Sequence, residues 1–311
     1  MKKIETILQY LSENIKKQIL KYLEENENNI EEIRIRNEKP LAIKTSKKNI
    51  SLKDVVSVQD TLQTFQKICE NSIYSYKKQI CDGYITIKNG HRIGITGNCV
   101  VENGQVININ YISSLNIRVA REKKGCSDEI LKYIIDIENK KIYNTLIVSK
   151  PGCGKTTILR DLIRNISNGI SKYNIDGKNC SIIDERGEIS AMNKGICQND
   201  VGIFTDVIEN VPKSKGMNMA VRSMAPDVLA CDEIGSIDDI KAINYAVCSG
   251  VKGIFTAHGE NIEELLINYQ LTELLQKFII EKIIFLDSNK KGKMKHCYYL
   301  DKKQKKYIKE F

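Results

Sequence analysis

The sequence contains no uninterrupted apolar run of about 18 residues, the length that a membrane-spanning helix needs. The basic start Met1-Lys2-Lys3 is not followed by the apolar core of a signal peptide, because Glu5, Gln9 and Glu13 interrupt it. We therefore expect no spanning segment and no secretory signal. A hydrophobic fraction of 41% and a charged fraction of 28% are those of a soluble globular protein, and 311 residues are enough for two domains.

The sequence also lacks cysteine pairs. Of its 10 cysteines, no two are spaced as C-x-x-C, and none has metal-ligand spacing with the 3 histidines. Structural zinc sites show such spacings. We therefore expect no zinc, and we interpret most of the cysteines as reduced, buried thiols of a cytoplasmic protein.

Residues 1–125 predict an N-terminal α+β domain. Apolar residues recur there at helical spacing, which predicts one amphipathic helix through Ile4, Leu8, Leu11, Ile15 and Ile19. The elements predicted after this helix are strands at 33–36 and 40–44, a helical region at 55–80, and strands between 83 and 119 that include a hairpin at Asn89-Gly90. The polar segment 122–128 predicts a linker.

Residues 126–311 change to an alternation of strand and helix, which is typical of a parallel α/β sheet. The predicted elements are helix 128–138, strand 144–149, helix 154–167, strand 180–185, strand 227–233, helix 237–249, strand 252–257 and a hairpin of 282–287 with 296–301. Ser236 and Asp239 form a capping box at the start of one helix, and Gly250 ends it.

The segment NTLIVSKPGCGKT, residues 144–156, has the pattern of a phosphate-binding loop between a strand and a helix. Glycines let such a loop curl so that its N–H groups point at an anion, and the N-terminus of the next helix adds positive partial charge. Lys155 is expected to reach the β- and γ-phosphates, and the Thr156 hydroxyl to hold Mg²⁺. Ser149 replaces the first glycine of the usual pattern. The residues expected to line the nucleotide are Pro151, Gly152, Cys153, Gly154, Lys155, Thr156 and Thr157.

Acidic residues follow the apolar strand PDVLACDE. Asp232 is expected to hold Mg²⁺ from the edge of the sheet, and Glu233 to polarise the water that attacks the γ-phosphate. A glutamate poised in this way favours hydrolysis over phosphoryl transfer to a small molecule.

Four further residues are candidates for the site. His258 follows the next strand and is predicted to sense the γ-phosphate or its water. Asp184 and Glu185 end another strand and either serve the metal and the water or form a structural ion pair with Arg186. Arg222 is predicted to reach a phosphate from its own or a neighbouring subunit.

The net charge of +9 is unevenly distributed. Residues 287–311 hold 9 lysines against 3 acids, which gives this basic C-terminal tail a charge of +6. Such a tail contacts nucleic acid, anionic lipid or an acidic partner, or is only a solvated end. Its aromatic residues are not clearly interleaved with the lysines as base stacking would need, which makes nucleic acid an unlikely partner.

Together, SKPGCGKTT, IIDERGEI, GMNMAVRSMAPDVLACDEIG and IFTAHGEN resemble the type II/type IV secretion ATPases, and most of all a sporulation branch of that family in endospore-forming bacteria. The N-terminal segments IEEIRIRNEKPLAI, GHRIGITGNCVVENG and SSLNIRVARE share the resemblance, which therefore covers nearly the whole chain. The resemblance implies a RecA/AAA-like P-loop NTPase core with a smaller N-terminal α+β domain.

The resemblance also implies a homo-hexameric motor that uses ATP and Mg²⁺. In such a motor the N-terminal domain packs over a neighbouring nucleotide site, which makes Arg92, Arg118 and Arg121 candidates for phosphate contacts. It further implies a cytoplasmic protein peripheral to the membrane, docked on the mother-cell side of a channel through membrane-bound sporulation or secretion proteins.

The leading hypothesis is a P-loop ATPase that drives or assembles a transenvelope complex. One alternative is a nucleic-acid translocase or helicase, which the net charge favours. Another is a nucleotide-gated scaffold without significant turnover. The residues give no preference for ATP over GTP.

Overall fold

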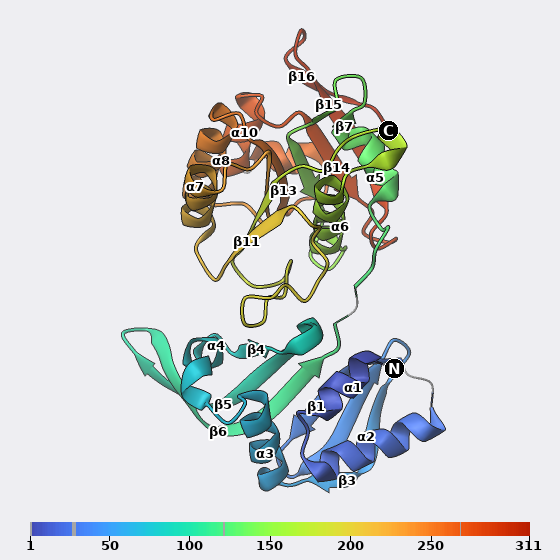
Figure 1. Cartoon of the computed structure of the whole chain (residues 1–311), viewed down its shortest axis with the longest axis vertical. Coiled ribbons are helices and arrows are strands. Elements are labelled where there is room, and N and C mark those ends of the chain that lie inside the picture. Colours follow the sequence, from blue (N-terminus) through green and yellow to red (C-terminus); the bar gives the residue numbers. More distant parts are fainter. Residues whose placement is uncertain (1, 27–28, 121, 268) are drawn as a thin grey trace. The chain divides into compact units, whose positions relative to one another are not determined.

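The computed structural model describes residues 2–26, 29–120, 122–267 and 269–311 (Figure 1). The chain divides into two units. The first consists of Met1–Arg121 with Ala191–Gln198, and the second of Glu122–Ser190 with Asn199–Phe311. The sequence predicts a boundary at residue 125, and no pattern in it indicates that a segment near residue 195 belongs to the first unit.

The N-terminal unit is built on a 6-stranded sheet of order β3-β2-β1-β6-β5-β4, in which neighbouring strands are antiparallel. Its strands are β1 (Ile30–Arg36), β2 (Lys39–Thr45), β3 (Asn49–Val56), β4 (Tyr84–Thr86), β5 (Arg92–Glu102) and β6 (Gln105–Arg118). Its helices are α1 (Lys2–Leu8), α2 (Glu13–Glu25), α3 (Val58–Ile68), α4 (Lys77–Cys81) and the 3-10 turns η1 (Ile73–Tyr76) and η2 (Lys88–Gly90).

One face of this sheet is covered by helices and the other carries charge. Alternation along β1 sends Ile33 and Ile35 into a core that they share with residues of α1, α2 and α3. Arg34 and Arg36 lie on the opposite face and are half-buried. The predicted alternation of residues 33–36 therefore describes a real strand.

The single N-terminal helix predicted from residues 4–19 is wrong, because the chain breaks into α1 and α2. Ser12 lies at the break and caps α2, where its hydroxyl accepts from the N–H of Ile15. The same hydroxyl donates to a carboxylate oxygen of Asp60 over 2.7 Å. A serine that can cap a helix competes with helix continuation, and here the bond to α3 favours the cap.

The C-terminal unit is built on an 8-stranded sheet of order β11-β10-β12-β13-β9-β14-β15-β16. Its strands are β9 (Thr145–Val148), β10 (Cys180–Asp184), β11 (Thr205–Glu209), β12 (Val228–Cys231), β13 (Lys252–Ala257), β14 (Lys282–Leu286), β15 (Met294–Asp301) and β16 (Lys306–Lys309), with β7 (Ile135–Asp136) and β8 (Lys141–Ile142) forming a separate pair. Its helices are α5 (Asp128–Ile134), α6 (Lys155–Asn168), α7 (Lys213–Ser223), α8 (Ile237–Cys248), α9 (Ile262–Ile267), α10 (Tyr269–Gln276) and the 3-10 turn η3 (Ser171–Tyr173).

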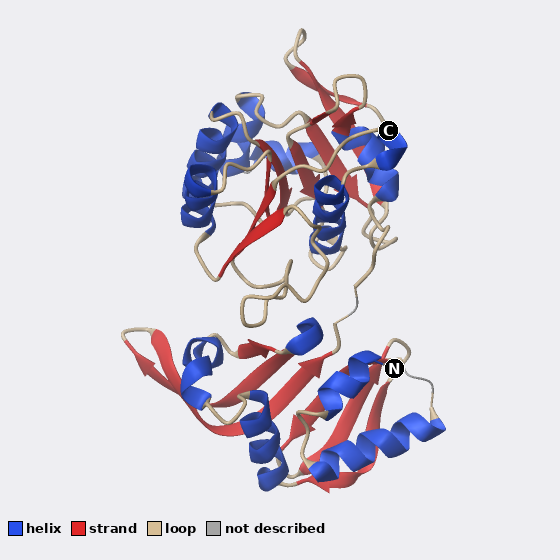
Figure 2. Ribbon diagram, viewed as in Figure 1, coloured by secondary structure: helices blue, strands red, loops and turns tan. Residues whose placement is uncertain are grey.

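Strands β9 to β14 of this sheet run parallel, as the strand–helix alternation predicted. Helices α7, α8 and α10 share one hydrophobic core with the sheet, and α6 lies on the other side (Figure 2). The capping box of Ser236 and Asp239 forms at α8 as expected. Parallel strands covered on both sides leave their carboxyl ends at one edge, where loops can meet.

The predicted basic tail is not a loose end. Residues 294–301 and 306–309 are strands that extend the sheet antiparallel beyond β14. The Tyr307 hydroxyl donates to the Ile280 carbonyl over 2.8 Å, and Lys282 pairs with Glu310 at 2.6 Å. The predicted hairpin of 282–287 with 296–301 is therefore confirmed, whereas β16 was not predicted.

The predicted linker 122–128 is fastened to α6. Asp161 is buried on that helix, and its carboxylate accepts from the N–H groups of Gly125 and Ser127 at 3.1 and 2.9 Å. Burial by itself raises the pKa of Asp161, but these bonds and those from the Ser127 hydroxyl and Arg164 outweigh it and lower the pKa. The start of the C-terminal unit is therefore tied to the helix that follows the phosphate loop.

Candidate active site

The glycine-rich loop joins β9, in the middle of the parallel strands, to α6. Strands β13 and β14 flank β9, so the loop emerges at the carboxyl edge of the sheet. Gly152 and Gly154 have φ of 80° and 99°, a backbone conformation that residues with a side chain rarely adopt. The helix that starts at Lys155 directs its free N–H groups toward this loop. The predicted strand, loop and helix are therefore all present.

Lys155 is buried within the loop, with a relative exposure of 5%. Its ammonium donates to the carbonyls of Ser149 and Lys150 at 3.0 and 3.3 Å and lies 3.2 Å from Nδ1 of His258. Burial lowers the pKa of Lys155, while the carboxylates of Asp232 and Glu233 act in the opposite direction. The ammonium is thus held at the centre of the loop by groups that a phosphate can replace.

Asp232 lies beside the loop and is bonded to two threonines. The Thr156 hydroxyl donates to Asp232 Oδ2 over 2.5 Å, and the Thr256 hydroxyl donates to Oδ1. Hydroxyl and carboxylate oxygens are ligands that Mg²⁺ prefers. The pairing brings together the two residues predicted to hold the metal, and their chemistry fits Mg²⁺.

Glu233 has a left-handed backbone, with φ of 53°, which turns its side chain away from the line of the strand. Its N–H donates to Thr256 Oγ1 over 2.8 Å. Its carboxylate lies 2.9 Å from Arg186 and 3.2 Å from Nε2 of His258. Thr256 therefore positions both neighbouring acids.

The imidazole of His258 connects Lys155 to Glu233. Because the ammonium can only donate, Nδ1 of His258 acts as the acceptor and Nε2 carries the proton that faces Glu233. This is the tautomer that satisfies both neighbours at once. The predicted sensor is thus in contact with the predicted phosphate ligand and with the predicted base.

Two residues of this network were missed by the sequence analysis. Lys213, at the start of α7, donates to the Glu233 carbonyl over 2.7 Å and pairs with Glu185 at 3.4 Å. Thr256 could have been found, because it is a hydroxyl residue in an apolar strand just before His258. Lys213 gave no signal, since 20 residues separate it from Glu233.

Asp184 has a structural part in this chain. Only 2% of it is exposed, and it accepts from the N–H groups of Glu188, Ile189 and Ser190 at 2.8, 3.0 and 2.8 Å. The turn after β10 uses both of its oxygens, so the prediction that it serves the metal or the water is not supported. Arg186, its predicted ion-pair partner, reaches Glu233.

The four arginines predicted as phosphate ligands lie in different parts of the chain. Arg222 is exposed in the last turn of α7. It lies nine residues after Lys213, which puts their backbones about 13 Å apart along the helix at 1.5 Å per residue. It therefore does not reach the site of its own chain, and only a role toward a neighbouring subunit stays a prediction. Arg92 and Arg118 lie opposite each other on β5 and β6, and the Arg92 guanidinium stacks 3.6 Å above the Tyr84 ring. Arg121 lies outside the described residues.

A further segment missed from the sequence lies against the phosphate loop. In the turn between β14 and β15, the N–H of Gly292 donates to the Cys153 carbonyl over 2.9 Å. A side chain at Gly154 would come within 3.6 Å of the Gly292 backbone. This turn therefore supports the loop from one side.

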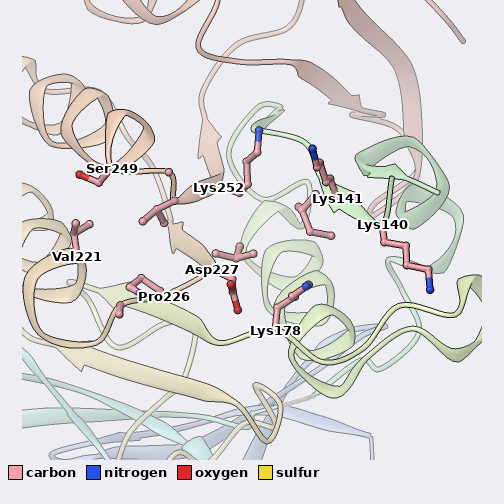
Figure 3. Close-up of a pocket in the computed structure, with 13 residues that line it drawn as sticks. Lys140, Lys141, Lys178, Val221, Pro226, Asp227, Ser249 and Lys252 are labelled. Carbon is pink, nitrogen blue, oxygen red and sulfur yellow. The ribbon is translucent and has the colours of Figure 1, made fainter. Parts of the chain in front are cut away.

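A groove of about 470 Å³ lies at the other end of the sheet, away from these residues (Figure 3). It is lined where β12 and β13 begin, whereas the acids and His258 lie where the same strands end. By contrast, a small cavity of about 20 Å³ lies beside Glu233, lined also by Glu185, Arg186 and Lys213. The two hollows differ in chemistry as well as in size.

Comparisons with known proteins agree with this architecture. A family model described as "Sporulation stage III, protein AA" matches residues 1–306. "Stage III sporulation protein AA" of Bacillus subtilis (strain 168) is 35% identical over 284 residues, which are 91% of this chain and 91% of that protein.

Solved structures with a similar fold include an ATPase and a pilus retraction motor. The Legionella pneumophila ATPase DotB has a TM-score of 0.61 at 15% identity, over 94% of this chain and 82% of its own. The pilus retraction motor PilT, solved with bound ADP, has a TM-score of 0.56 at 17% identity, over 86% of this chain and 77% of its own. The predicted P-loop NTPase fold is thereby confirmed. Within the described residues, no helix is both long and apolar enough to span a bilayer.

Proposed function

Because the chain belongs to the sporulation stage III protein AA family, we propose that it is a P-loop ATPase that hydrolyses ATP with Mg²⁺ to drive or assemble a transenvelope sporulation channel. The observation that carries this proposal is the shared contact of His258. Its imidazole lies 3.2 Å from the Lys155 ammonium and 3.2 Å from the Glu233 carboxylate. One side chain thus joins the residue that binds phosphate to the residue that activates water.

Binding of the triphosphate falls to the loop itself. The left-handed glycines turn loop N–H groups inward, and the N-terminus of α6 adds positive partial charge. The Lys155 ammonium exchanges two neutral carbonyl acceptors for phosphate oxygens, and charge-assisted hydrogen bonds are about twice as strong as neutral ones. Burial of Lys155 strengthens this preference because it removes competing water.

Thr156 and Asp232 are the residues that would hold Mg²⁺. When bound there, the ion neutralises charge that develops on the β- and γ-phosphate oxygens. Thr256 keeps the Asp232 carboxylate oriented through its hydroxyl. The three side chains come from α6, from the residue after β12 and from β13, so the packed sheet fixes their spacing.

Glu233 is the general base. The cavity of about 20 Å³ beside it has room for one water, for which about 10–15 Å³ is needed. Glu233 accepts a proton from this water, while His258 and Arg186 orient the carboxylate from two sides. Because His258 contacts both residues, a loss of phosphate contacts at Lys155 would also affect Glu233.

The activity is tested by phosphate release and nucleotide binding with matched variants. Lys155→Ala is expected to lose both, and Glu233→Gln to keep binding and lose turnover. Lys241→Ala and Glu263→Gln, on exposed positions of α8 and α9, are the controls and keep both. Equal turnover in wild type and Glu233→Gln would contradict the assignment of the base. The same assay with GTP defines the nucleotide preference.

A nucleotide-gated scaffold is the second candidate, because Glu233 is engaged by both Arg186 and His258 in this chain. A scaffold binds ATP at the same loop without hydrolysing it. Saturable binding with no phosphate release at any protein concentration would favour it over the ATPase.

The biological setting rests on the family. We place the protein in the cytoplasm, peripheral at the membrane on the mother-cell side, as a homo-hexamer in contact with membrane-bound channel proteins. Gel filtration of Glu233→Gln with ATP is expected to give the hexamer, and a monomer in every nucleotide condition would contradict it. Affinity capture of the intact chain from sporulating cells, with and without ATP, is expected to recover membrane channel proteins.

A further inference from the structure

The groove of about 470 Å³ in the C-terminal unit is rimmed by four lysines from three separate segments (Figure 3). Lys140 ends the turn after β7 and Lys141 opens β8, Lys178 precedes β10, and Lys252 opens β13. Residues so distant in sequence meet only because the fold brings these segments to one edge of the sheet. Asp227 is the one carboxylate among the residues that line the groove.

The charges of this rim are not balanced by the groove itself. Asp227 already accepts from the N–H of Asn179 over 2.9 Å, and Lys252 pairs with Glu281 at 2.9 Å. Within the described ranges, the ammonium groups of Lys140, Lys141 and Lys178 form no ion pair.

Other negative groups lie near the rim. Asp136 faces Lys141 across the β7–β8 pair. The carbonyl ends of α7 and α8 contribute about half a negative charge each. Together with Glu281 and Asp227 these groups offset the lysine charge overall, so the positive surplus is confined to the lining side chains, where four lysines face one carboxylate.

The groove also has an apolar floor. Ile142, Val221 and Pro226 line it together with the buried valines that start β12 and end the turn before β13. A free phosphate ion would gain nothing from such a floor. A ligand that carries apolar groups between its negative charges would use both parts.

We propose that this groove binds an extended acidic segment of a partner protein, with carboxylates toward the lysine rim and apolar side chains on the floor. The lining residues include no arginine, histidine or aromatic side chain. Base stacking and bidentate phosphate contacts, which mark nucleic-acid sites, are therefore not provided by this lining. Lysines give point charges that suit flexible carboxylates.

The groove is separate from the site proposed for ATP, and its proposal does not rest on that function. Strand β13 begins at the groove with Lys252 and ends at Ala257, beside His258. The five steps between its six residues, at about 3.3 Å each, put the two ends about 17 Å apart. Partner and nucleotide can therefore bind to one unit at the same time.

The test uses a short fluorescent peptide of alternating glutamate and leucine with the full-length protein. The groove variant is Lys140→Gln with Lys141→Gln and Lys178→Gln, and Lys252 is kept because it pairs with Glu281. The control variant is Lys295→Gln with Lys303→Gln and Lys305→Gln, exposed lysines outside the groove that remove the same charge. Fluorescence anisotropy gives the affinity, and thermal unfolding checks that both variants fold.

The peptide is expected to bind wild type and the control alike. The groove variant should weaken binding about tenfold, because each exposed charge pair contributes only a few-fold. A peptide in which serine replaces leucine should bind more weakly to wild type, as the floor requires.

Equal affinity of the two lysine variants would overturn the proposal, and so would tighter binding of the serine peptide. Competition by single-stranded DNA or by anionic lipid vesicles that exceeds competition by the unlabelled peptide would also overturn it. Repeating the titration with Lys155→Ala separates the two functions. Peptide binding that survives this change supports the groove whether or not the chain hydrolyses ATP.

Discussion

The two ends of the parallel sheet differ in how their charged side chains are paired. At the carboxyl ends, Lys155, His258, Glu233 and Arg186 contact one another in a row. At the amino ends, three of the four lysines around the groove form no ion pair within the part of the chain that the structure describes. A ligand at the carboxyl ends must replace contacts that these side chains make with one another. A ligand at the amino ends can pair with the three lysines without breaking an ion pair. This difference marks the carboxyl end as a site for switching and the amino end as a site for docking.

The largest effect is expected from Lys155→Ala, which removes the cation at the centre of the carboxyl-end network. Nucleotide affinity should fall about a hundredfold, because hydrogen bonds to charged groups contribute about 1.5–3 kcal/mol each. Turnover should fall to background. Titration calorimetry with ADP measures the affinity, and Lys241→Ala should leave it unchanged.

Glu233→Gln should lower turnover about 10²–10⁴-fold, the usual contribution of a general base, and leave ATP binding within about threefold. The amide keeps the size of the side chain but accepts no proton. Single-turnover phosphate release separates this loss from product release. A variant that binds ATP poorly would show that Glu233 serves the fold of the loop.

Thr256→Val tests whether one buried hydroxyl positions both acids. The change removes a donor to Asp232 and an acceptor for the N–H of Glu233 at nearly constant volume. Turnover should fall about tenfold or more, since each lost bond costs about 1–3 kcal/mol where a partner stays unsatisfied. Thr256→Ser should restore most of the activity, and equal loss in both variants would point to packing instead.

Asp161→Asn removes a charge with a structural role, and we expect it to lower the stability of the fold. The pKa of Asp161 is lowered in the folded state, so its contribution is present above the ordinary carboxyl pKa and is lost as pH falls through the folded value. The variant should unfold about 2–8 °C lower at pH 7, for a loss of about 1–2 kcal/mol.

The gap between wild type and Asp161→Asn should begin to narrow as pH falls below about 4, the ordinary carboxyl pKa, and should close once pH has fallen through the lowered pKa of the folded state. Thermal unfolding by circular dichroism at several pH values measures it. A gap that is the same at pH 7 and pH 3 would contradict the charge-based account.

The smallest effect is expected from the groove variant on ATP hydrolysis. Removal of the charges of Lys140, Lys141 and Lys178 should change turnover by less than about twofold in the absence of a partner, since about 17 Å separate the two ends of β13. A much larger change in turnover would mean that the two ends of the sheet are coupled, and it would contradict the view that they act independently.

The sequence predicted the parts of the site that lie close together along the chain. The phosphate loop and the pair Asp232-Glu233 are local patterns, and each follows or precedes a strand that periodicity identifies. Thr256 and Lys213 were missed because their roles depend on which strands become neighbours. That is set by the order of β12 and β13 in the sheet and not by spacing.

The errors in the fold have similar causes. Ser12 ends a helix because Asp60, 48 residues away, bonds its hydroxyl. Strand β16 was missed because exposed lysines flank its two half-buried residues, Tyr307 and Ile308. Asp184 looked like a ligand at the sheet edge, but the backbone of the next turn uses it. In each case a long-range or loop contact decided what local propensity left open.

The most direct measurement is a crystal structure of the full-length protein with Mg²⁺ and a slowly hydrolysed ATP analogue. We expect the triphosphate in the loop between Ser149 and Thr156, with the Lys155 ammonium on its oxygens, the metal between Thr156 and Asp232, and Glu233 facing the terminal phosphate. An analogue bound elsewhere, or a loop whose Lys155 still contacts its own carbonyls at saturating ligand, would contradict the account.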